Sequence, residues 1–134
     1  MWINKYIGIP FSEKAKGTFK EADCYGIVEL IYKEELNIEI YKHTSAARST
    51  KNVMLEYAME SKSNWIKVEK PKEFDVIAMA HDISHPNIIQ HFGIYIGNNK
   101  ILQTLQGKNS HIVDFEQYKY CIKAIHRHKE MIWK

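Results

Sequence analysis

The amino-acid sequence predicts an α+β fold in which N-terminal helices pack on an antiparallel β-sheet. Apolar residues recur at helical spacing in the first half of the chain, and they alternate at strand spacing after Trp65. Helices followed by strands are typical of the α+β class. The 134 residues contain no linker and no internal repeat, so we expect a single domain over residues 1–134.

Two helices are predicted. The first begins near Asp23, a good N-cap residue, and its apolar stripe consists of Cys24, Ile27, Val28 and Ile31. The second extends from Thr44 to about Glu60. Residues 1–20 are predicted to be irregular, because they are punctuated by Gly8, Pro10 and Gly17.

The predicted strands cover residues 74–80, 91–97, 101–105, 112–115 and 121–128. A turn at Gly97-Asn98-Asn99-Lys100 joins the second of these strands to the third. A three-residue loop would place Gln103 diagonal to His91 on one face, whereas a two-residue loop would place Gln106 opposite His91. Either glutamine could accept a hydrogen bond from the imidazole.

Composition excludes several classes of function. The chain has 19 lysine and arginine residues and 16 aspartate and glutamate residues, so its net charge is 19 − 16 = +3. This charge is small and the basic residues are scattered, so we expect no nucleic-acid partner. No apolar run approaches the length of a membrane span, so we expect no membrane insertion. Two cysteines make neither a disulfide framework nor a zinc knuckle. The first residues lack the pattern of a signal peptide, so we expect synthesis in a cytoplasm.

Cys24 and His91 are the residues best placed for chemistry. A cysteine at a helix start is favoured as the reactive thiolate, and a strand histidine facing it would complete a thiol–imidazole pair. Considered alone, each residue has another interpretation: Cys24 could be a small core residue, and His91 could be a surface residue. His81 and His85 have helical metal-ligand spacing but lie in a predicted loop, and His126 and His128 fit a solvated strand edge. We therefore expect no metal and no cofactor.

Two motifs together resemble a known family. The segment Asp23-Cys24-Tyr25-Gly26-Ile27-Val28 at a helix start, with His91-Phe92-Gly93-Ile94-Tyr95-Ile96-Gly97 on a strand, is similar to the NlpC-type cell-wall cysteine peptidases. Residues 8–11, 73–77 and 122–127 resemble further segments of that family. The resemblance implies a compact papain-like domain that cuts peptide bonds in peptidoglycan stem peptides, commonly between D-glutamate and a diamino acid.

The resemblance also assigns roles to residues. Cys24 matches the nucleophile and His91 the base, while Gln103 stands where the family usually has a histidine, which favours the three-residue loop. Phe11, Asp23 and Tyr25 are expected on the substrate side, with Asp23 acting as helix cap rather than as catalytic acid. Phe11 replaces a common tyrosine, and Phe74 replaces a common glycine before Asp75.

Tyr25 after the cysteine, and the Gly-Ile-Pro-aromatic opening segment, are most similar to members carried by the tails of phages. This implies tail proteins as partners, location in the virion and action at the bacterial cell wall. Two alternatives stay open. One is a structural or assembly protein of the tail with little hydrolysis. The other is a circularly permuted acyltransferase, in which Cys121, which follows His91 in the chain, would be the nucleophile.

Overall fold

The structure is a computed structural model that describes residues 1–14, 17–40, 64–80, 84, 89 and 91–131. The second predicted helix, residues 44–60, and the pair His81 and His85 lie outside the described residues.

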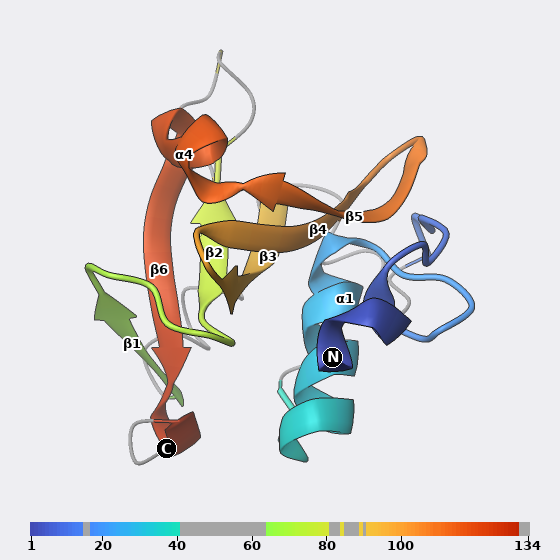
Figure 1. Cartoon of the computed structure of the whole chain (residues 1–134), viewed down its shortest axis with the longest axis horizontal. Coiled ribbons are helices and arrows are strands. Elements are labelled where there is room, and N and C mark those ends of the chain that lie inside the picture. Colours follow the sequence, from blue (N-terminus) through green and yellow to red (C-terminus); the bar gives the residue numbers. More distant parts are fainter. Residues whose placement is uncertain (15–16, 41–63, 81–83, 85–88, 90, 132–134) are drawn as a thin grey trace.

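Six strands form one antiparallel sheet in the order β1-β6-β2-β3-β4-β5 (Figure 1). The strands are β1 (Trp65–Val68), β2 (Val76–Met79), β3 (His91–Gly97), β4 (Lys100–Leu105), β5 (Lys108–Asp114) and β6 (Ile122–His128). The predicted α+β class is confirmed, and β3 has the predicted bounds. The sequence did not predict β1, and it placed only the end of β5.

The predicted first helix is α1 (Cys24–Ile31), which continues as a π-helical turn over Tyr32–Leu36. The Asp23 carboxylate accepts a hydrogen bond from the Gly26 amide at 2.6 Å, which confirms the N-cap. Asn37, with φ of 55°, ends the helical segment in the left-handed region. The helix packs on β3 and β4 (Figure 1).

The apolar stripe of α1 is buried against one face of the sheet. Ile27, Val28 and Ile31 join Phe92 and Ile94 of β3 in the larger core cluster. The opposite face carries a smaller cluster that contains Ile77, Met79, Ile101, Phe115, Cys121 and Ile125. Side chains of β3 therefore alternate as predicted, with His91 and Tyr95 turned away from Phe92 and Ile94.

Asp75 and Arg127 join the segment before β2 to β6. The guanidinium donates to both carboxylate oxygens, at 2.9 Å and 2.7 Å, and Asp75 also accepts from the Lys72 amide at 2.7 Å. The bidentate pair stabilises the charge of a nearly fully buried carboxylate. The residue before it, Phe74, has φ of 77°, in the left-handed region that favours glycine. The Phe74 ring stacks on Trp2, with ring centroids 4.7 Å apart, so the residue in this unfavourable backbone conformation is held by a side-chain contact.

The prediction that His126 and His128 lie on a solvated edge is wrong. Both side chains are buried, because β1 pairs with β6 and covers it. His128 packs edge-to-face on Trp65 with centroids 4.8 Å apart. Burial, followed by the nearby Lys67 charge, lowers the pKa of His126 to about 4, although Asp75 opposes the shift.

This burial predicts an acid-sensitive fold. The folded pKa of His126 lies below the unfolded value of about 6.5, so its contribution to stability is complete above pH 6.5 and is lost as the pH falls to about 4. We expect the loss to reach about 3 kcal/mol, at 1.36 kcal/mol for each unit of pKa shift. Urea unfolding at pH 7 and pH 4 measures it. The His126→Leu variant should lose less free energy of unfolding between these pH values; an equal loss in both proteins would contradict the assignment.

Candidate active site

Cys24 is the first residue of α1 and is half-buried against the larger core cluster. The first turn of a helix leaves backbone amides without intrahelical partners, and Asp23 accepts from that of Gly26. A thiol in this position is close to the backbone N–H groups of the helix start, which favour negative charge. The predicted reactive position therefore has the local structure that the sequence indicated.

His91 and Gln103 are brought together across β3 and β4. The Nε2 atom of His91 lies 2.9 Å from the Oε1 atom of Gln103, and the Gln103 side chain is fully buried while that of His91 is 5% exposed. An amide oxygen only accepts, so Nε2 of His91 carries the hydrogen and Nδ1 is left with a lone pair. Gln106, the alternative partner, is exposed and donates to Glu13 at 2.5 Å.

The hairpin register explains this pairing. The turn itself has the two-residue form, with Gly97 opposite Lys100 and with Asn98 and Asn99 both at positive φ. A bulge between Tyr95 and Gly97 then shifts the strands by one residue, so that Ile94 pairs with Leu102. The register beyond the bulge is the one predicted for the three-residue loop, and it places Gln103 beside His91.

Two further polar side chains, which the sequence analysis did not single out, contact Gln103. Its Nε2 atom lies 3.3 Å from Nε2 of His111 on β5 and 3.4 Å from the Tyr118 hydroxyl, in the short helix α4 (Phe115–Tyr118). His111 stands directly opposite Gln103 in the β4–β5 register. The predicted strand began only at Ile112, so that this cross-strand neighbour was not identified; extending the strand by one residue would have included it.

The start of α1 lies against the start of β3. Tyr25 and Phe92, the residues that follow Cys24 and His91 in the chain, are in edge-to-face contact with ring centroids 5.6 Å apart. The opening segment adds a second connection. Ile9 exchanges hydrogen bonds with Ser110 of β5, and Ala22 bonds to Pro10 and Ser12 just before the helix. The two elements that carry Cys24 and His91 are thus held side by side.

The three residues expected on the substrate side have different surroundings. Phe11 is half-buried and forms an isolated bridge with Ala22, next to the helix start. Asp23 is buried and serves as the helix cap. The side chain of Tyr25 is only 2% exposed and packs in the core, so its ring offers almost no surface for a substrate.

Cys121 has the opposite surroundings to Cys24. It ends a 3-10 turn, Lys119–Cys121, immediately before β6 and is buried in the smaller core cluster. Its thiol donates to the Tyr118 carbonyl at 3.2 Å, and burial raises the pKa of the Cys121 thiol. Neither feature favours a thiolate, so the geometry does not support the permuted assignment.

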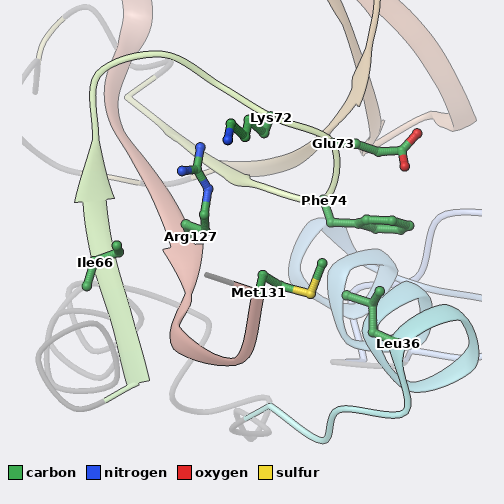
Figure 2. A pocket seen from close by; sticks show the side chains of 7 residues that line it. All are labelled: Leu36, Ile66, Lys72, Glu73, Phe74, Arg127 and Met131. Carbon is green, nitrogen blue, oxygen red and sulfur yellow. The ribbon is translucent and has the colours of Figure 1, made fainter. Parts of the chain in front are cut away.

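A pocket among the described residues lies away from these side chains (Figure 2). It has a volume of about 470 Å³ and is lined by Leu36, Ile66, Lys72, Glu73, Phe74, Arg127 and Met131. Figure 2 shows Lys72 and Arg127 on one side and the Phe74 ring with Leu36 and Met131 on the other. The guanidinium is already paired with Asp75, and none of the predicted site residues lines this cavity.

Within the part of the chain that the structure describes, no three His, Cys, Asp or Glu side chains form a metal-binding group. Among the same residues, no helix has the length and apolar character needed to cross a membrane.

Comparison with known proteins identifies the fold and family. A search of the curated proteins finds no match. Among solved structures, NlpC2 from Trichomonas vaginalis is 21% identical, with a TM-score of 0.72, over 95% of this chain and 44% of that one. An NlpC/P60 family protein from Bacillus cereus is 20% identical, with a TM-score of 0.67, over 92% and 36%. The NlpC/p60 domain of peptidoglycan hydrolase SagA is 16% identical, with a TM-score of 0.64, over 92% and 91%.

The chain therefore spans less than half the length of the Trichomonas vaginalis and Bacillus cereus proteins and nearly all of the isolated SagA domain. These likenesses show the papain-like fold of NlpC/P60 domains, as predicted. The sequence itself matches the NlpC/P60 family over residues 10–130, which is most of its length. The chain belongs to the NlpC/P60 family.

Proposed function

We propose that this chain is a cysteine peptidase that hydrolyses peptide bonds in peptidoglycan stem peptides, with Cys24 as nucleophile, His91 as base and Gln103 as the group that orients His91. The observation that carries the proposal is the buried His91–Gln103 pair on strands beside the start of α1. Family membership supports the reaction class, since NlpC/P60 proteins are typically cell-wall peptidases. The SagA domain, similar in fold, comes from a protein described as a peptidoglycan hydrolase.

The mechanism begins with transfer of the Cys24 thiol proton to Nδ1 of His91, the nitrogen that Gln103 does not occupy. The thiolate attacks the scissile carbonyl carbon, and backbone amides at the start of α1 stabilise the oxyanion. His91 returns its proton to the leaving amine, which leaves an acyl-enzyme thioester. Water then attacks the thioester, His91 accepts the water proton, and the thiol and a new carboxyl group are released.

We also propose that the substrate approaches the helix start past Phe11, which is half-buried beside Ala22. Asp23 and Tyr25 would support this surface from beneath, through the cap and through the ring contact with Phe92. Since Phe11 lacks the hydroxyl that many relatives have, it would bind substrate by apolar contact.

Digestion of purified peptidoglycan tests the reaction. We expect new amino termini in Gram-negative or Gram-positive walls, or in synthetic stem peptides, when products are separated and identified by mass spectrometry. The Cys24→Ala variant is the control and should release none, because no other side chain supplies the nucleophile. If the wild-type chain cleaves nothing from either wall type, the structural role in a tail becomes the better explanation.

Attachment to a phage tail is proposed on sequence alone, from Tyr25 and the opening segment. A tail partner would raise the local concentration of the peptidase at the wall, since tethering makes the second contact intramolecular. Digestion should therefore be repeated with the tail partner present. Cleavage that is equal with and without it would argue against tethering.

A further inference from the structure

His111 and Tyr118 surround the amide of Gln103 on the side opposite His91. The hydrogen bonds form a chain from β5 through β4 to β3: Asn109 to His111, His111 to Gln103, and Gln103 to His91. The proposed mechanism uses only the last bond of this chain. Because one end of the chain is a backbone carbonyl, which can only accept, the position of each hydrogen along it can be deduced.

The deduction starts at His111. Its Nδ1 atom lies 2.7 Å from the Asn109 carbonyl oxygen, so Nδ1 carries the hydrogen. In the neutral ring, Nε2 then has the lone pair, and the group that faces it must be a donor. The Gln103 amide nitrogen, at 3.3 Å, is that donor.

Tyr118 reinforces the same orientation of the amide. Its hydroxyl oxygen lies 3.4 Å from Gln103 Nε2, so that both hydrogens of the amide nitrogen have acceptors on this side. A flipped amide would place its oxygen against the lone pair of His111, and its nitrogen would then favour the other tautomer of His91. The contact with His111 would be repulsive, and Gln103 is fully buried, so water could not replace the lost partner.

We propose that His111 is a positioning residue, which acts through Gln103 to hold His91 in the tautomer with hydrogen on Nε2 and the lone pair on Nδ1. The inference rests on the proposed function only in that Nδ1 is the nitrogen that would receive the Cys24 proton. It also explains how a glutamine can orient the base from position 103. An amide has two faces of opposite character, and His111 determines which of them His91 meets.

Nuclear magnetic resonance of the ring nitrogens tests the tautomers directly. The experiment uses the Cys24→Ala variant with ¹⁵N-labelled histidine near pH 8, so that no thiolate draws a second proton onto His91. We expect opposite tautomers, with hydrogen on Nε2 in His91 and on Nδ1 in His111. Hydrogen on Nδ1 of His91 would overturn the inference, whether or not the wild-type chain hydrolyses peptidoglycan.

Kinetics of His111 variants give a second readout. His111→Leu removes the acceptor and should lower kcat about tenfold with KM unchanged, because His91 then spends less time in the productive tautomer. His111→Gln offers an amide oxygen at a similar reach and should restore kcat to within about twofold. Ile112→Thr, at the exposed neighbouring position on the opposite face of β5, is the matched control and should behave as wild type.

The outcomes separate the two proposals. If the wild type is active and His111→Leu matches it in both kcat and His91 tautomer, the inference fails and the peptidase function stands. If the wild type is inactive, the tautomers in the Cys24→Ala protein still decide the inference. If His111→Leu does not fold, the tautomers measured in the Cys24→Ala protein and the kinetics of the His111→Gln variant still test the inference.

Discussion

Replacing His91 by alanine should lower turnover about 10³-fold, within the range expected for loss of a general base. The imidazole hydrogen-bonds to Gln103 through Nε2, so Nδ1 is the nitrogen that would accept the thiol proton. Hydrolysis of a synthetic stem peptide at pH 7 measures the effect. The loss should appear in kcat, because the proton is transferred in the chemical step and not on binding.

His91 is more deeply buried than a residue facing an open cleft, so His91→Ala will also disturb packing. It leaves the buried Gln103 oxygen without a donor, which costs about 1–3 kcal/mol of stability. His91→Gln is therefore the better variant: its amide nitrogen can donate to Gln103, but it is not a base. Equal loss of turnover in both variants, with less destabilisation in His91→Gln, would assign the effect to proton transfer. Appreciable turnover by a folded His91→Gln protein would exclude His91 as the base.

Substituting each of the two glutamines shows which of them orients His91. Gln103→Ala should cost less than His91→Ala, about 10-fold to 10²-fold, because an orienting group does not transfer the proton. Gln106→Ala should have no effect on turnover, since the Gln106 side chain donates to Glu13 and lies on the exposed turn. The reverse order of effects would contradict the assignment of Gln103.

Much of this site could be predicted from sequence because the signals are local. A cap residue before an apolar helical stripe located Asp23 and Cys24, and strict alternation located β3. The face of His91 followed from the same alternation. The register of β4 depended on a turn with two possible forms, and the choice between them came from family resemblance.

What could not be predicted depends on contacts between distant segments. The bulge at Tyr95–Gly97 combines a two-residue turn with the other register, and no local pattern specifies it. The burial of His126 and His128 requires β1, a short strand whose alternation is too brief to recognise. His111 becomes part of the site only because β5 pairs with β4. In each case a long-range pairing gives a residue its surroundings.

The two cysteines should differ in alkylation rate by about two orders of magnitude or more near neutral pH. Only the thiolate reacts, and its population falls tenfold for each unit by which the thiol pKa is raised. Cys121 has a raised pKa from burial and is 2% exposed, whereas Cys24 is half-buried at the first turn of α1. Limited iodoacetamide treatment of the folded protein, followed by peptide mass mapping, measures both rates in one sample.

Denaturation supplies the control for this comparison. In guanidinium chloride both thiols are exposed and lose their structural surroundings, so the two rates should converge. If they do, the difference in the folded protein reflects the helix start and the core, and not the flanking residues. Activity should disappear in step with labelling of Cys24, because the modified sulfur can no longer attack a carbonyl. Faster labelling of Cys121 in the folded protein, with activity lost in proportion to it, would instead identify Cys121 as the nucleophile and revive the permuted arrangement.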